Sequence, residues 1–196
     1  MQIIEYPDGA TPLEPEEMEG LKLRHITMRS ELDRWEQANI QEAFEWVARR
    51  RKTISIISET FLCQLHEKMF GKVWKWAGTF RHTNKNIGVE WPYISVELKM
   101  LLDDVNFWID NKTYPPEEIT YRFHHKLVWI HLFPNGNGRH SRMIADILLT
   151  KVFDLKAFSW GSGNLVEAGV TRKQYITALK AADRHDYSLL QAFVIS

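Results

Sequence analysis

The chain has 196 residues, of which 44% are hydrophobic and eight are tryptophan, so it can bury one sizeable core. Its 25 Lys and Arg residues balance its 25 Asp and Glu residues, and the formal net charge is zero. This balance argues against a dedicated nucleic-acid surface or an anionic-membrane surface. The first residues lack the basic and long apolar regions of a signal peptide, and no apolar run reaches transmembrane length. We therefore expect a cytoplasmic protein without nucleic-acid or membrane partners.

The N-terminal part of the chain predicts an extended arm followed by helices. Residues 1–12 favour the arm, and a short helix is expected over about 13–20, where a proline precedes a run of acidic residues. Apolar side chains recur at helical spacing over 27–51 and over 59–70. Each of these two stretches begins at or just after a Thr or Ser that can cap a helix, which supports both helices.

The rest of the chain continues this pattern with one interruption. Residues 79–94 place glycines, asparagines and a proline among apolar residues, and they predict a short β-hairpin. Further helices are predicted over about 95–111, 116–130, 137–153, 171–184 and 187–195. Together these signals predict a mainly α-helical domain over 27–196, preceded by an N-terminal arm over 1–26.

The most informative stretch is HLFPNGNGRHSR, residues 131–142. Gly136 and Gly138 can adopt positive φ without steric cost, so the chain here can curl its N–H groups around an anion. The next helix begins at this turn, and its unpaired N–H groups carry partial positive charge that favours phosphate. Arg139 and Arg142 share a face of that helix, and arginine forks match phosphate oxygens. The stretch therefore predicts a site for a polyphosphate.

His131 is the candidate base of this site. It lies five residues before Gly136, at the end of the preceding helix. Its unperturbed pKa suits proton transfer near neutral pH. A lone histidine at this position would more often cap the helix C-terminus, but a histidine beside a phosphate site favours the base. Phe133 is expected to anchor the loop in the core.

These residues resemble the signature of the Fic family, His-x-Phe-x-(Asp/Glu)-Gly-Asn-Gly-Arg-x-x-Arg. The matching residues are His131, Phe133, Gly136, Asn137, Gly138, Arg139 and Arg142. The length, the helical pattern and the N-terminal extension are also similar to the mobile mystery protein B subgroup of that family. The resemblance implies a Fic-type helical domain with one β-hairpin, the flap. It also implies an AMP transferase that moves AMP from ATP to a Ser, Thr or Tyr hydroxyl of a target protein.

The resemblance implies a role for each matching residue. His131 would take the proton from the target hydroxyl, while Asn137 and the backbone N–H groups of the turn hold the α-phosphate. Arg139 would bind the outer phosphates and Arg142 the γ-phosphate. The flap, residues 79–94, would bind the target protein by strand addition.

Two positions in the signature bear on the metal ion and on the reaction. Asn135 stands where the family usually has an acid that binds Mg²⁺, and an amide oxygen is a weaker ligand for Mg²⁺ or Mn²⁺. Three outcomes follow: the ATP phosphates hold the metal, activity is low, or the preferred nucleotide differs. Gly138 is retained, whereas the phosphotransferase branch of the family has lysine at that position. This favours transfer of AMP over transfer of phosphate.

Glu19 and Gly20 resemble the end of an inhibitory helix found in many Fic proteins. In that helix a Glu pairs with the second motif arginine, so Glu19 would pair with Arg142. Pro15 occupies the Ser/Thr position of the inhibitory motif, so the match is partial. A solvated acidic helix is an equally good interpretation.

Two classes of function remain open from the sequence. One is the AMP transferase. The other is a nucleotide-binding regulatory protein or toxin–antitoxin partner with little catalysis, and a phosphotransferase or AMP-removing enzyme is a third alternative. His124, His125 and His140 cluster near His131 in sequence, but packing and polar contacts are the favoured interpretation over a metal site.

Overall fold

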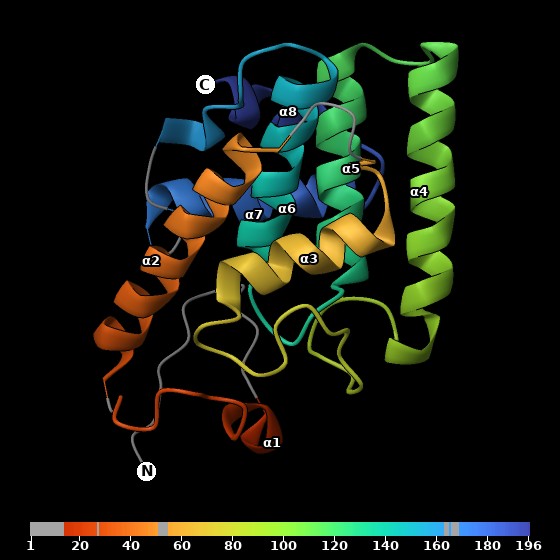
Figure 1. Cartoon of the computed structure of the whole chain (residues 1–196). Helices are drawn as coiled ribbons and strands as arrows, with labels where there is room; N and C mark the ends of the chain where they lie inside the picture. Colours follow the sequence, from red (N-terminus) through yellow and green to blue (C-terminus); the bar gives the residue numbers. More distant parts are fainter. Residues whose placement is uncertain (1–13, 27, 51–54, 163–164, 166–168) are drawn as a thin grey trace.

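The computed structural model describes residues 14–26, 28–50, 55–162, 165 and 169–196 (Figure 1). These residues are mainly α-helical, as the sequence predicts. The α-helices are α1 (Pro15–Met18), α2 (Arg29–Ala48), α3 (Glu59–Phe70), α4 (Ile94–Asn111), α5 (Pro116–Ile130), α6 (Asn137–Ile147), α7 (Val170–Ala182) and α8 (Ser188–Ile195). Three shorter helical turns are η1 (Trp91–Tyr93), η2 (Leu148–Val152) and η3 (Trp160–Ser162). Across the described ranges, no helix combines the length and the apolar character that a bilayer span requires.

Helix α6, which begins at the candidate site, lies in the middle of the bundle (Figure 1). It packs against α3 and α5, while α2 covers α3 and α4 covers α5 on the outside. Two apolar clusters form the core, one around α2–α6 and one around α7 and α8. Tyr121 of α5 and Ala145 of α6 belong to the second cluster. Helices α5 and α6 are therefore held by both clusters, which fixes the loop between them.

Local sequence signals place several helix ends correctly. Helix α3 has the predicted bounds, and the Ser58 hydroxyl accepts a hydrogen bond from the Phe61 N–H at 3.2 Å. Helix α5 begins at Pro116, whose missing N–H costs nothing in the first turn. The predicted helix over 137–153 forms as α6 followed by the π-helical turn η2. The predictions for 1–12 and for the helix ends at 27 and 51 lie outside the described residues.

The predicted β-hairpin over 79–94 is not observed. These residues form an irregular loop that runs into η1 and α4, and none of them is in a strand. The loop carbonyls bind a side chain instead of a partner strand: Arg81 Nη1 donates to the Thr83 carbonyl at 2.8 Å, and Nη2 donates to the Val89 carbonyl. A guanidinium can bind these carbonyls without the hydrogen bonds of a paired β-strand. The turn-forming residues alone could not predict this contact.

The N-terminal segment 14–26 packs on the loop that follows α3. Leu21 and Trp74 form an isolated antiparallel bridge. Helix α1 adds a buried ion pair in which Glu17 Oε2 lies 2.5 Å from Lys85 Nζ. The segment is therefore joined to the helical domain, and the predicted boundary between 26 and 27 stays a prediction.

Five histidines are buried in or beside the core: His66, His124, His125, His131 and His140. Burial lowers the pKa of His124 to about 3, and it lowers the pKa of His131 and of His140 to about 4. The His140 ring lies 3.0 Å from the Leu62 carbonyl and the His124 ring lies 3.1 Å from the Tyr175 hydroxyl. These imidazoles are neutral at pH 7 and make polar contacts within the fold.

The buried imidazoles predict a loss of stability in mild acid. In the unfolded chain they bind protons below about pH 6.5, whereas in the folded protein they do so only near pH 4 or below. The free energy of unfolding should therefore fall as the pH drops from 6.5 to 4, by on the order of 3 kcal/mol for each group. Asp146 opposes this in part, because burial raises its pKa to about 6. Urea unfolding at a series of pH values measures the net loss.

A pair of variants tests the source of this loss. In His140→Gln the amide can still donate to the Leu62 carbonyl but does not titrate, so the acid-induced loss should be smaller. His25→Gln, at an exposed position, should leave the loss unchanged. An equal pH dependence in both variants would contradict the assignment.

Candidate functional site

His131 sits at the C-cap of α5 in a left-handed conformation, with φ 59° and ψ 65°. Its imidazole is buried, and Nδ1 lies 3.4 Å from the Val128 carbonyl oxygen. Burial, followed by the nearby Arg81 charge, lowers the pKa of His131 to about 4. Because Nδ1 faces an oxygen, we assign the proton of the neutral ring to Nδ1, which leaves the lone pair on Nε2. This is the protonation state that a general base requires.

The glycine turn differs in detail from the prediction. Gly136 has φ +79°, and a Cβ there would lie 2.6 Å from the Phe70 ring. Gly138, by contrast, lies within the first turn of α6 and does not adopt positive φ. A Cβ on Gly138 would meet only Arg142 Nη1, at 3.5 Å. The backbone therefore requires glycine at 136, whereas position 138 leaves open space at the helix N-terminus.

Asn137 braces the loop with both polar atoms of its side chain. Its Oδ1 accepts from the Phe133 N–H at 2.9 Å, and its Nδ2 donates to the Phe133 carbonyl at 2.7 Å. These two hydrogen bonds close the turn between α5 and α6. The predicted contact of Asn137 with an α-phosphate stays a prediction.

His66 of α3 contacts the other side of the loop, which sequence reasoning did not predict. Its ring stacks on Phe133 with centroids 3.7 Å apart, which confirms that Phe133 anchors the loop. One ring nitrogen accepts from the Gly78 N–H at 2.9 Å, so the other carries the proton and donates to the Asn135 carbonyl at 3.0 Å. Burial lowers the pKa of His66 well below its usual value, which keeps this neutral tautomer.

Arg139 is paired within the protein. Its Nη1 lies 2.5 Å from Glu36 Oε2, and its guanidinium lies over the Phe70 ring, 4.7 Å from the centroid. The other oxygen of the Glu36 carboxylate accepts from Trp74 Nε1 at 2.6 Å. Glu36 lies on α2 and was missed, because its spacing in sequence gave no reason to link it with the loop.

Arg142 lies beside the start of α6, where its Nη1 would be 3.5 Å from a Cβ at Gly138, and its predicted contact with the γ-phosphate stays a prediction. Its guanidinium is 5.5 Å from the centre of the Tyr175 ring. The predicted pair between Glu19 and Arg142 is not observed: Glu19 is an exposed C-cap residue, and it has no ion pair with Arg142 among the described residues. The carboxylate of α1 that is buried is Glu17.

The residues around Asn135 do not fit a Mg²⁺ or Mn²⁺ ion. The Asn135 Oδ1 accepts from the Gly136 N–H at 2.7 Å and from Arg139 Nη2 at 3.4 Å. An oxygen that already accepts from a guanidinium is a poor ligand for a cation. Among the described residues, no three His, Cys, Asp or Glu side chains gather in a way that could hold a metal ion.

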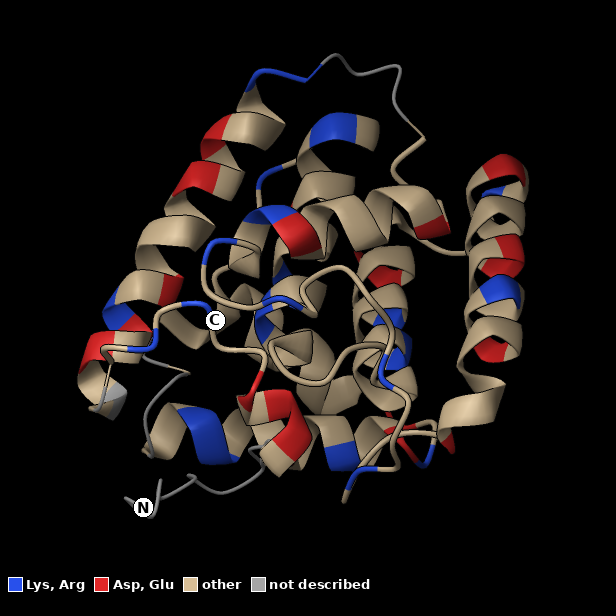
Figure 2. Ribbon diagram, turned by 60° about the horizontal axis from the view of Figure 1, so that its bottom comes forward, with Lys and Arg blue, Asp and Glu red and all other residues tan. Residues whose placement is uncertain are grey.

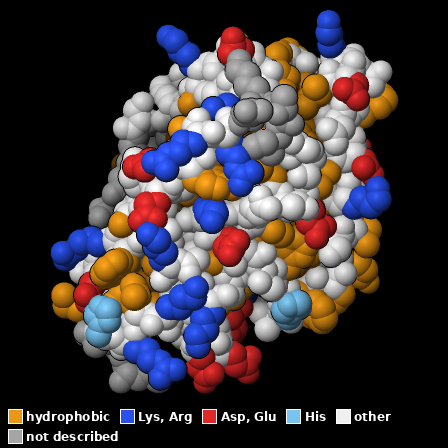
Figure 3. Space-filling view, viewed as in Figure 1, with side chains coloured by type: hydrophobic (Ala, Val, Ile, Leu, Met, Phe, Trp, Pro, Cys, Tyr) orange, Lys and Arg blue, Asp and Glu red, His pale blue; other side chains and the backbone are white. Residues whose placement is uncertain are grey.

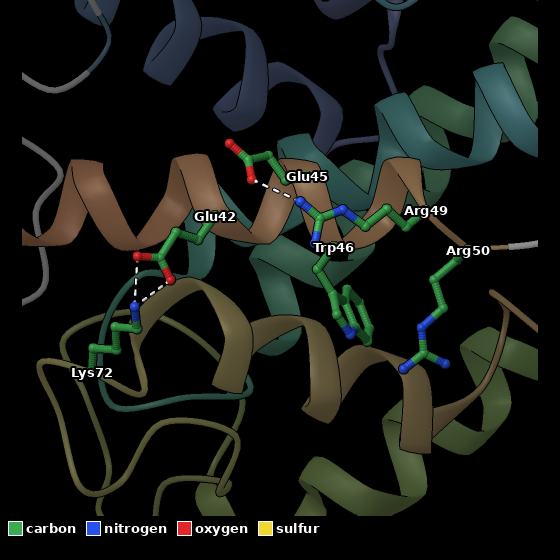
Figure 4. A pocket seen from close by; sticks show the side chains of 6 residues that line it. All are labelled: Glu42, Glu45, Trp46, Arg49, Arg50 and Lys72. Atoms are coloured by element: carbon green, nitrogen blue, oxygen red, sulfur yellow. Dashed lines mark hydrogen bonds and ion pairs between the residues drawn. The ribbon is translucent and has the colours of Figure 1, made fainter.

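A separate surface hollow lies between α2 and α3 (Figure 4). It is lined by Glu42, Glu45, Trp46, Arg49, Arg50 and Lys72, none of which belongs to the loop at 131–142. Its carboxylates pair with its own cations, Glu42 with Lys72 and Glu45 with Arg49. Elsewhere, Lys and Arg are interspersed with Asp and Glu along the ribbon in Figure 2 and on the face shown in Figure 3. The hollow therefore gives no sign of the chemistry seen at the loop.

Comparison with known proteins shows what this site is similar to. Residues 56–149, just under half of the chain, match the Fic/DOC family. It is similar to the protein adenylyltransferase Fic of Drosophila grimshawi, with 28% identity over 68% of this chain and 27% of that protein. The corresponding protein of Aedes aegypti is 30% identical over 46% of this chain and 19% of that protein. The chain thus spans about a quarter or less of the length of these curated relatives.

Solved structures show the same fold. The N-terminal FIC domain of Bep8 from Bartonella sp. 1-1C superposes with a TM-score of 0.71 at 14% identity, covering 90% of both chains. BepC from Bartonella tribocorum, solved with bound AMPPNP, superposes with a TM-score of 0.68 at 19% identity, covering 95% of this chain and 92% of that chain. These likenesses confirm the Fic-type helical fold.

Alanine at the two turn glycines should affect the stability of the protein differently. Gly136→Ala forces a positive φ on alanine and a clash with the Phe70 ring, so it should destabilise the protein by about 1–3 kcal/mol. Gly138→Ala meets no close protein atom and should leave the unfolding midpoint unchanged or slightly raised. It should nevertheless weaken ATP binding, because the methyl group fills the open space. Thermal unfolding and ATP titration of both variants test this, and equal destabilisation by both would contradict it.

Proposed function

We propose that this protein is an AMP transferase that moves AMP from ATP to a Ser, Thr or Tyr hydroxyl of a target protein. The observation that carries the proposal is one arrangement: a neutral buried imidazole at the end of α5, followed directly by a helix N-terminus with open space at Gly138 and the Arg142 guanidinium beside it. A helix N-terminus and a guanidinium favour phosphate, and the imidazole supplies the base.

The chemistry needs little covalent work from the protein. His131 Nε2 accepts the proton of the target hydroxyl as the hydroxyl oxygen attacks the α-phosphorus. The bond from that phosphorus to the β-phosphate oxygen breaks, and pyrophosphate leaves with the electron pair. Positioning and charge stabilisation supply most of the catalysis, through the N–H groups of α6 and through Arg142 and Arg139.

The comparisons support this proposal. The curated relatives are named protein adenylyltransferases, and the BepC structure holds AMPPNP, an ATP analogue. Because Asn135 does not fit a metal ion, no step is assigned to Mg²⁺, and any Mg²⁺ that enters with ATP would depend on the phosphates. A cytoplasmic location and membership of the mobile mystery protein B subgroup stay predictions.

Labelled ATP separates the alternative functions. Label from the α-phosphate should become covalently attached to the protein or to lysate proteins, whereas label from the γ-phosphate should not. His131→Ala should reduce this labelling at least about 100-fold, because it removes the base. His185→Ala, at an exposed position, is the matched control and should label normally.

Other outcomes would contradict AMP transfer. Saturable ATP binding without covalent label would favour a nucleotide-binding regulatory protein or toxin–antitoxin partner. Label from the γ-phosphate alone would indicate a phosphotransferase. Release of AMP from a protein that already carries it would indicate an AMP-removing enzyme.

We also propose that Glu36 restrains the enzyme. The Glu36 carboxylate pairs with Arg139, a residue that the Fic signature assigns to the outer phosphates, so an incoming triphosphate would compete with Glu36 for that guanidinium. This contact takes the place of the Glu19–Arg142 pair that the sequence suggested. Trp74 fixes the other oxygen of the carboxylate, which holds it in place.

Substitution of Glu36 tests this restraint. In Glu36→Gln the amide oxygen can still accept from Trp74, but the charge that pairs with Arg139 is gone. ATP should bind about 10-fold more tightly and α-labelling should increase, while the protein loses stability because the partly buried Arg139 guanidinium has lost its partner. Glu42→Gln, on the same helix but paired with Lys72 at the surface, should change neither. Unchanged or weaker ATP binding in Glu36→Gln would refute the restraint.

We further propose that the loop at 79–94 contacts the target protein. Ile87 is 39% exposed and Trp91 is 42% exposed, so apolar side chains are available on the loop. Gly88, between them, packs against the Cβ of His131. A target segment held on these side chains would lie close to the candidate base.

A further inference from the structure

Arg81 is the one arginine whose side chain is almost completely buried, with 1% relative exposure among the described residues. It lies near the start of the loop at 79–94. In the described structure it has no carboxylate within ion-pair distance. A buried charge is costly unless other groups compensate it, so its partners indicate what it does.

Four backbone carbonyls compensate the Arg81 guanidinium. They are those of His131 at 2.6 Å from Nε, Thr83 at 2.8 Å from Nη1, Ile130 at 3.3 Å from Nη2, and Val89, which also accepts from Nη2. Two of them belong to the end of α5, where the last carbonyls have no intrahelical partner and carry partial negative charge. The other two belong to the loop at 79–94. The guanidinium therefore joins the loop to the end of α5.

These bonds act on the conformation that presents the candidate base. His131 is left-handed, which is unfavourable for a residue with a side chain unless neighbouring contacts hold it. Arg81 binds the carbonyls of His131 and of the residue before it, and the Arg81 N–H donates to the Leu132 carbonyl at 3.0 Å. Three successive carbonyls around the base are thus fixed by one residue.

We propose that Arg81 is a positioning residue for His131, because it fixes the left-handed turn that points the imidazole at the substrate and joins that turn to the loop above it. The inference rests on the proposed function in one respect, that His131 acts as the base. The contacts between Arg81 and the backbone carbonyls do not depend on that function.

The charge of Arg81 gives the proposal a second readout. Burial lowers the pKa of His131 to about 4, and Arg81 and then Lys85 contribute further in the same direction. From α1, Glu17 is paired with Lys85 rather than with the imidazole. Removing the Arg81 charge should therefore raise the pKa of His131, whereas a change that keeps the charge should not.

Two substitutions separate position from charge. Arg81→Lys keeps the charge but cannot reach four carbonyls from one nitrogen, and Arg81→Met keeps the stem but removes charge and donors. Both should lower the rate of α-labelling at saturating ATP by about 100-fold, with the half-saturating ATP concentration changed less than threefold. The pKa of His131, followed by NMR and assigned by its absence in His131→Gln, should rise by about one unit in Arg81→Met and stay unchanged in Arg81→Lys.

Arg122→Lys is the matched control. Arg122 is a partly buried arginine of α5 that pairs with Glu118 far from the loop, so its substitution should lower only the unfolding midpoint. If Arg81 has a purely structural role, Arg81→Lys should behave like Arg122→Lys. Its unfolding midpoint would then be lowered, but its labelling rate at temperatures well below that midpoint would be normal, and this would overturn the proposal. A change confined to ATP affinity would also overturn it.

The NMR measurement keeps this test independent of the proposed function. If the natural protein never labels anything, AMP transfer fails while the pKa of His131 in Arg81→Met still decides whether Arg81 acts on the imidazole. An unchanged pKa of His131 in folded Arg81→Met would contradict the placement of the Arg81 charge beside the imidazole, and so the proposal, even if AMP transfer is correct.

Discussion

Two helix ends meet at one short loop, and the backbone groups at these ends lack partners within their helices. At the end of α5 the free carbonyls are satisfied by the Arg81 guanidinium, which is thereby buried without a carboxylate. At the start of α6 the first N–H groups have no partner within the helix, and a Cβ at Gly138 would meet only Arg142 Nη1. The first end is compensated by a cation of the protein, whereas the second carries partial positive charge that favours an anion. His131 sits between them, so its environment is set by both ends.

The sequence predicted what is decided locally. Ser58 before an apolar helix, proline at the start of α5 and glycine at 136 each act through neighbouring backbone groups, and each is observed in its expected role. The signature at 131–142 belongs to this class, because its residues follow one another along a single loop. The mainly α-helical fold also follows, since helical periodicity is a local property.

What the sequence missed depends on distant partners. Glu36 is 103 residues from Arg139, and His66 is 69 residues from the Asn135 carbonyl that it binds. The hairpin over 79–94 is not observed, because turn-forming residues indicate a change of direction but do not show what satisfies the loop carbonyls. The Glu19–Arg142 pair is not observed either, because the partial motif only indicated a carboxylate on this short helix, and the packing of α1 buries Glu17 instead.

The zero net charge of the chain conceals a local excess of cations around the loop. Arg81 is compensated by carbonyls and Arg139 by Glu36, while Arg142 has no ion-pair partner in the part of the chain that the structure describes. Burial is the main cause of the lowered pKa of His131, and the charges of Arg81 and Lys85 act in the same direction. The excess of cations also favours an anion as the ligand of the loop. Burial and local charge together therefore favour both the neutral imidazole and the phosphate binding that the proposed AMP transfer needs.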